Sequence, residues 1–274
     1  MADVMQAINK LPSLPAVVLE LITSMEDEDV DIDTLARKIS LDQALSAKTL
    51  RLANSSFYGV QRQITSARDA IPVLGFRTLH NVAVTAALAN ALGDGGEPSF
   101  SFVSFWRHSI GTALCAKALA PQLGLNTETA YTAGLIHDIG RLVLATRFAP
   151  AYAQVTALRV RDDCYPVQAE RALLGLDHAG VGAALAQHWK FPDAIQRSTG
   201  EHHASDMRHA EPLTAAIHVA DAIAHALGFS TDDGDLVPEV SDATLRAIGM
   251  DQAKLIAVFQ AAEKNFDAAC SVLA

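Results

Sequence analysis

Apolar residues recur along most of the chain at the three- to four-residue spacing of amphipathic helices, whereas the strict apolar and polar alternation of β-strands is scarce. Proline or acidic residues open several of these segments, as is typical of helix starts. In the first third, the pattern predicts helices at residues 12–27, 31–39, 41–53 and 76–92, with a segment at 66–71 that leads into Pro72. We therefore predict an all-α protein.

The stretch GDGGEPS follows the last of these segments and has the glycine, proline and aspartate content of an exposed loop. We place a boundary between two packed helical lobes there, at about residues 93–98. Beyond it, the pattern predicts helices near 102–120, 127–147, 150–163, 167–173, 178–189, 192–198 and 212–228, and a last pair near 241–248 and 251–270. The DDGD run at 232–235 lacks the spacing of a calcium-binding loop, so we interpret it as solvated.

Composition narrows the class of protein. Half of the 274 residues are hydrophobic, which is enough for a sizeable core, and the net charge of -10 disfavours nucleic acid as a partner. We expect the three cysteines, Cys115, Cys164 and Cys270, to be buried free thiols of a reducing compartment. No signal segment or membrane-spanning apolar run occurs, so we expect a cytoplasmic protein that does not bind a membrane.

Polar residues inside apolar helices carry the candidate chemistry, because burying such groups costs free energy unless they are paired or bind something. In TAGLIHDIGRLVL, a histidine and an aspartate stand side by side in an apolar run. One histidine of this kind is more often a satisfied core residue than a ligand. The pattern recurs, however, at His108, His137 with Asp138, His178, His202 with His203, and Asp221.

The helix expected at 127–147 places four of its polar or small residues on one stripe: Gly134, His137, Asp138 and Arg141. Glycine costs about 1 kcal/mol relative to alanine inside a helix, so Gly134 and Gly140 need a reason. Close approach of another group to the stripe is one reason. Tight packing against a neighbouring helix is the other.

Convergent imidazoles and carboxylates are typical of paired divalent metals, which need a bridging carboxylate and can generate a hydroxide nucleophile near neutral pH. We predict that Asp138 bridges two ions, with iron or manganese as the expected metal. One ion is assigned to His108, His137 and Asp221, and the other to His178, His202 and His203.

The order of these residues resembles the H…HD…D pattern of the HD superfamily, an all-α group with many metal-dependent phosphohydrolases. The segments LPSLPAVVLEL, ISLDQALSAKTLRLANSSFYG and ITSARDAIPVLGFRTLHNVAV closely resemble the HDOD domain, a regulatory output relative in bacterial signalling. The resemblance covers about residues 11–225. It implies an N-terminal HDOD lobe at 11–92 and an HD-like lobe at 99–228, on which helices within 236–274 would pack.

HDOD proteins are generally regarded as non-catalytic, yet His178, His202 and His203 resemble the additional ligands of HD-GYP cyclic-di-GMP phosphodiesterases. The resemblance to these enzymes is incomplete. The Gly-Tyr-Pro loop is missing after His203, Ser104 stands where trinuclear members have a glutamate, and Arg141 replaces a common lysine. Arginine binds phosphate bidentately but does not donate a proton at ordinary pH.

The leading hypothesis is therefore a bacterial regulatory module with a bound metal pair that passes its state to a signalling protein partner. The second is a metal-dependent phosphohydrolase acting on a nucleotide or cyclic dinucleotide, with Asp138 and Arg141 as catalytic residues. The third is a metal-free helical scaffold. We assign the aromatic pair Trp189 and Phe191 to the core in all three cases.

Overall fold

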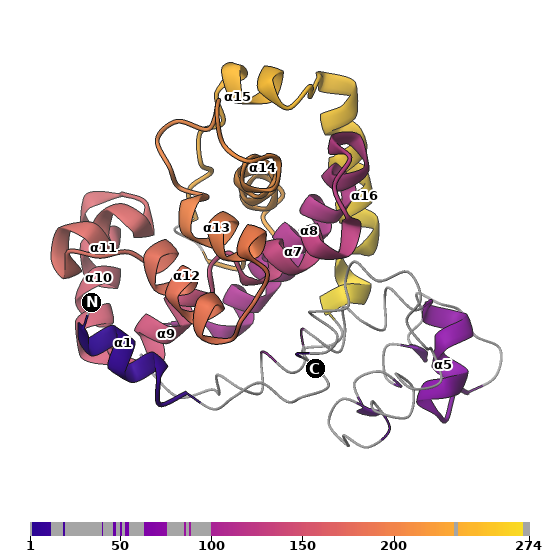
Figure 1. Cartoon of the computed structure of the whole chain (residues 1–274), viewed down its shortest axis with the longest axis horizontal. Helices are drawn as coiled ribbons and strands as arrows, with labels where there is room; N and C mark the ends of the chain where they lie inside the picture. Colours follow the sequence, from indigo (N-terminus) through magenta and orange to yellow (C-terminus); the bar gives the residue numbers. More distant parts are fainter. Residues whose placement is uncertain are drawn as a thin grey trace.

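The computed structural model describes residues 2–11, 63–75, 100–232 and 235–270, together with scattered positions between 19 and 88. All regular structure within these ranges is helical, with no strand, which confirms the predicted all-α class (Figure 1). The helices expected at 12–27, 31–39, 41–53 and 76–92 and the lobe boundary at 93–98 fall outside the described ranges, and those predictions stay open.

Two helices of the N-terminal part are described, α1 (Ala2–Ile8) and α5 (Ala67–Leu74). Helix α1 was not predicted, and it lies beside α9 and α12 in Figure 1 with Val4 and Ile8 buried. Helix α5 follows Ser66, whose hydroxyl accepts the Asp69 N–H at 3.0 Å, and it continues past Pro72, where we expected the segment to end. Proline removes only one helical hydrogen bond, and burial of Leu74 favours continuation.

From residue 102 onward, the chain forms a series of helices joined by mostly short connections. They are α7 (Phe102–Leu119), the 3₁₀ turn η1 (Ala120–Leu123), α8 (Thr127–Ile136), α9 (Ile139–Arg147), α10 (Ala149–Asp162), α11 (Pro166–Leu174), α12 (His178–His188), α13 (Asp193–Glu201), α14 (Pro212–Ala226), α15 (Asp242–Ala247) and α16 (Gln252–Cys270). Most begin and end within a few residues of the predicted bounds, because capping side chains mark the starts. Ser101, Asn126, Asp177 and Ser241 each accept a backbone N–H of the first turn.

The predicted helix at 127–147 is wrong in one respect, since it is two helices. Helix α8 ends at Ile136 and α9 begins at Ile139, with Asp138 between them at φ −97° and ψ 8°. Neighbouring residues of a continuous helix point 100° apart. The break allows His137 and Asp138 to reach the same site.

Close helix packing surrounds this break. A Cβ atom on Gly134 would lie 2.8 Å from the Cα atom of Ala113 in α7, and one on Gly140 would overlap the backbone carbonyl of His178 in α12. Tight packing therefore explains both glycines. The group that approaches the polar stripe is the backbone of a neighbouring helix.

The core of this part of the chain lies where α7, α8 and α14 meet, and α16 packs against α7 (Figure 1). Ile110 of α7 and Leu135 of α8 are fully buried, and Leu142 of α9 is fully buried in the same apolar cluster. Trp189 and Phe191 are buried as well, so their assignment to the core is confirmed.

The cysteines differ from the expectation in part. All three are free, but only Cys115 is buried, whereas Cys164 and Cys270 are half-buried. Cys164 lies in the connection between α10 and α11, and Cys270 is the last residue of α16, positions that leave both thiols partly exposed. Within the described ranges, no helix combines the length and hydropathy that crossing a bilayer requires.

Candidate metal centre

An oxygen of Asp138 is the meeting point of three histidines from different elements. Its Oδ1 atom lies 3.0 Å from Nε2 of His178, 3.5 Å from Nε2 of His202 and 3.6 Å from Nε2 of His137. His178 is the first residue of α12 and His202 directly follows α13. The turn between α8 and α9 thus directs Asp138 to the place where two other helix ends meet.

An oxygen of Asp221, on α14, makes a second set of contacts. Its Oδ1 atom lies 3.0 Å from Nε2 of His108, 3.3 Å from Nε2 of His225 and 3.4 Å from Nε2 of His137. His137 therefore contacts both carboxylates. The structure gathers all seven predicted ligands in one cluster, with His203 Nε2 3.0 Å from His178 Nε2.

The cluster is buried. Six of the seven predicted residues are at most 3% exposed, and His203 is half-buried. Side chains of this kind fall into three groups whose ligand atoms lie within 4.8 Å of one another. The groups are Asp138 with His178, His202 and His203; His108 with His137 and Asp138; and His108 with Asp221 and His225.

Hydrogen bonds on the outer side of the cluster orient three of the imidazoles. In each, Nδ1 lies next to an acceptor, so that Nδ1–H donates and Nε2 is directed at the centre. The acceptors are the carbonyl of Gly134 for His137 at 2.7 Å, the carbonyl of Thr199 for His202 at 2.8 Å, and Glu170 Oε2 for His178 at 2.7 Å. Metal-binding histidines are oriented in this way.

Three imidazole Nε2 atoms and an anionic carboxylate oxygen therefore face one another at Asp138. His202 Nε2 has no hydrogen-bond partner among the described residues. Burial would make such an arrangement costly without a cation between the acceptors. The donor set, with its imidazole nitrogens and carboxylate oxygens, fits a divalent first-row metal.

The charged groups of the cluster shift the pKa values of Asp138 and His178 in opposite directions. Burial would raise the pKa of Asp138, but the imidazoles of His137 and His178 and the guanidinium of Arg141 hold it well below its usual range. Burial acts against protonation of His178, yet Glu170 and Asp138 raise its pKa to about 10. The protein alone thus places a proton where a metal ion would bind.

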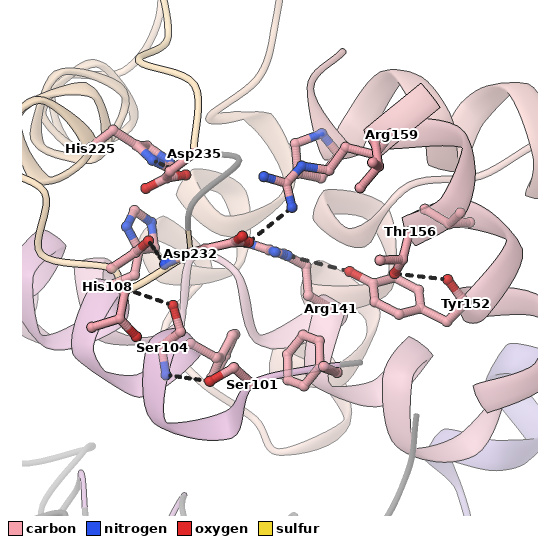
Figure 2. Close-up of a pocket in the computed structure, with 17 residues that line it drawn as sticks. Ser101, Ser104, His108, Arg141, Tyr152, Thr156, Arg159, His225, Asp232 and Asp235 are labelled. Carbon is pink, nitrogen blue, oxygen red and sulfur yellow. Dashed lines mark hydrogen bonds and ion pairs between the residues drawn. The ribbon is translucent and has the colours of Figure 1, made fainter. Parts of the chain in front are cut away.

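Arg141 supports Asp138 from the other side. Its guanidinium lies 2.9 Å from the Oδ2 atom of Asp138, and its Nε donates to the hydroxyl of Tyr152 at 3.4 Å (Figure 2). Both carboxylate oxygens of Asp138 are therefore engaged. The predicted catalytic role of Arg141 remains untested, and its observed contacts orient Asp138.

Sequence reasoning missed three residues of this site. Glu170 on α11 is fully buried and also accepts the backbone N–H of His178. His225 follows Asp221 by four residues, a spacing that places both on one helix face and could have revealed it. Asp235, which we placed in a solvated loop, lies 2.8 Å from His225 Nδ1.

Two cavities of about 300 Å³ each reach the cluster. Figure 2 shows the first, where His108 and His225 line one side and Arg141 and Arg159 the other. The second is lined by Asp138, His178 and His203 and by the guanidinium of Arg171. Arg141, Arg159, Pro166, His225 and Asp235 line both cavities. Small polar ligands have two routes to the candidate metal ligands.

Similar proteins share this architecture. An HDOD domain protein of unknown function from Geobacter sulfurreducens has a TM-score of 0.80 and 28% identity, with 99% of this chain and 97% of that chain covered. A candidate phosphohydrolase from Shewanella amazonensis has a TM-score of 0.74 and 28% identity over the same shares.

Among curated proteins, an uncharacterized protein of Treponema pallidum is 26% identical over 226 residues, which are 80% of this chain. This chain spans 43% of the length of that relative. The model of the HDOD domain family matches residues 11–205, more than half of the chain. The chain therefore belongs to the HDOD domain family.

Proposed function

We propose that the chain is a regulatory module that binds two divalent ions in the His/Asp cluster and passes its state to a signalling protein partner. The observation that supports this most strongly is the convergence of three oriented imidazoles on Asp138 Oδ1. The ligands come from α7, α12, α14, the α8–α9 turn and the end of α13. Ion occupancy would couple these five elements, and their packing is a state that a partner can recognise.

The contacts of Arg141 favour this function over catalysis. Its guanidinium is already committed to Asp138 and to Tyr152, so it positions a metal ligand. In the part of the chain that the structure describes, nothing replaces the substrate loop that HD-GYP enzymes carry after the double histidine; the chain continues as a turn through Asp206 and Arg208.

Hydrolysis of a nucleotide or cyclic dinucleotide is the second candidate function. It is favoured by the two cavities, which bring Arg159 and Arg171 near the cluster and are large enough for a phosphate group. A metal pair would supply an activated water to such a reaction. Asp138 would hold the metal ions, and Arg159 and Arg171 would orient the phosphate in exchange for their ion pairs with Asp232 and Asp177, neither of which is a candidate metal ligand.

One experiment separates these functions. The full chain is loaded anaerobically with Fe²⁺ or Mn²⁺, its metal content is measured, and the loaded protein is assayed in single turnover with cyclic-di-GMP and a simple phosphodiester. Bound metal without hydrolysis supports the regulatory module. Hydrolysis that disappears in Asp138→Ala supports the enzyme, and failure to bind any metal overturns both and leaves the metal-free scaffold.

The partner hypothesis needs a separate measurement. Proteins retained by the immobilised full chain are compared between its metal-loaded and metal-free forms. A partner whose retention depends on the metal supports the module. Identical retention by both forms contradicts the proposal that metal occupancy is the transmitted state.

A further inference from the structure

We infer that His225 is a ligand of the ion held by Asp221, so that three imidazoles bind this ion. The other two are those of His108 and His137. The sequence-based assignment gave this ion only the imidazoles of His108 and His137. The inference rests on the proposed metal-binding function and extends it to a residue that the resemblance to HD proteins does not assign.

The contacts of the two aspartates are closely parallel. Oδ1 of Asp138 faces three Nε2 atoms at 3.0–3.6 Å, and Oδ1 of Asp221 faces three Nε2 atoms at 3.0–3.4 Å. His137 is common to both sets. Without His225, the set around Asp221 would lack its third nitrogen.

The surroundings of His225 resemble those of His178. Its Nδ1 lies 2.8 Å from Oδ1 of Asp235, as Nδ1 of His178 lies 2.7 Å from Glu170, although only the His178 contact has the geometry of a hydrogen bond. Its ring centroid is 4.3 Å from that of His108, so both Nε2 atoms reach the same carboxylate oxygen. An imidazole with a carboxylate behind it and a shared oxygen in front is arranged as a metal ligand.

A protonated His225 that simply bridges Asp221 and Asp235 is the competing explanation. It accounts for the contacts of His225 but not for the convergence of His108 and His137 on the same Oδ1 atom of Asp221, at 3.0 and 3.4 Å. One cation bound there would satisfy all three Nε2 atoms and this oxygen at once. An ion bound there lies within reach of His225 as well.

The position of His225 gives the ion a further effect. Asp235 belongs to the segment between α14 and α15, which is also held by the ion pair of Arg159 with Asp232 at 2.9 Å and by the hydrogen bond from Tyr165 to the Val237 carbonyl at 3.0 Å. This segment lines both cavities. An ion at His225 therefore connects metal occupancy to a wall of both cavities.

Titration of the full chain with Co²⁺ tests the inference. In His225→Gln, one ion should bind with unchanged affinity and the other at least tenfold more weakly, with a change in the cobalt absorption spectrum. His188→Gln is the matched control, since His188 also lies in the last turn of its helix and belongs to none of the three groups of potential ligands. His203→Gln should weaken the other ion, and the double variant should weaken both.

Asp235→Asn keeps the imidazole and provides the test if His225→Gln does not fold, as judged by circular dichroism. Removing the outer carboxylate should weaken the same ion by about 10- to 100-fold. Wild-type titrations for both variants would overturn the role of His225 while leaving the proposed metal binding intact. If the wild-type chain binds no Co²⁺, the proposed function fails first, and this inference fails with it.

Discussion

Replacement of Gly140 by alanine tests whether the contact between α9 and α12 maintains the metal centre. The new Cβ atom would overlap the backbone carbonyl of His178 and lie 2.7 Å from the backbone nitrogen of Gly182. Both obstacles are backbone atoms, which cannot rotate away as a side chain can. The two helices must therefore separate, and His178 must move with α12.

The expected cost follows from two opposing effects. Alanine gains up to about 1 kcal/mol of helix propensity over glycine. Overpacking of a buried contact costs about 1–3 kcal/mol, and a clash with backbone on two sides belongs at the upper end of that range. The net loss for Gly140→Ala is about 2 kcal/mol, which corresponds to a fall in Tm of roughly 4–8 °C.

Thermal unfolding followed by circular dichroism measures this loss, and a Co²⁺ titration measures the effect on the site. Gly180→Ala is the matched control in α12, because its Cβ would meet only the side chain of Asp177, at an ordinary 3.5 Å. This control should keep or slightly raise the Tm and should leave Co²⁺ affinity unchanged. Equal Tm values for the two variants would refute the packing argument.

Three further predictions concern the site and its supports. Glu170→Gln retains the shape of the side chain that accepts from His178 but removes its charge, so Co²⁺ affinity should fall by about 10- to 100-fold; unchanged affinity would contradict this support. In the metal-free protein, burial lowers the pKa of His178, but Glu170 and Asp138 outweigh burial and raise this pKa to about 10. The stability that the protonated imidazole contributes to the fold is therefore complete below the unfolded pKa of 6.5 and is lost as the pH rises through about 10. Metal must displace that proton, so calorimetric heats of loading near about pH 8 should differ between buffers of different ionisation enthalpy, and identical heats would argue against proton release. Asn126→Ala removes the cap of α8, which should lower stability by about 1 kcal/mol in thermal unfolding without changing the number of bound ions; a changed number would show that the cap supports the site directly.

The helices beyond residue 100 were predictable because local signals mark them. Asn126 and Ser241 cap their helices through their own side chains, and apolar spacing identifies the buried faces. The break at His137 was not predictable, since no proline or other strong helix breaker stands there. The close contacts of Gly134 with α7 and Gly140 with α12 accompany it, and these are tertiary contacts that local propensity does not reflect.

The candidate ligands were found for a thermodynamic reason. His108, His178 and Asp221 stand among small or apolar neighbours, where unpaired polar groups would be costly. Glu170 gave no such signal, because its helix also carries the exposed polar residues Gln168 and Arg171, and its burial comes from the packing of α11 against neighbouring helices. The identity of the ions and of the protein partner depends on chemistry outside these residues and remains proposed.

The metal content of the purified full chain, measured by elemental analysis after anaerobic loading with Fe²⁺ or Mn²⁺, tests the central claim most directly. The acceptors that converge on Asp138 and Asp221 predict two tightly bound divalent ions per chain. The Asp138→Ala variant should lose at least one of them. A wild-type chain that retains no metal after loading would contradict the account.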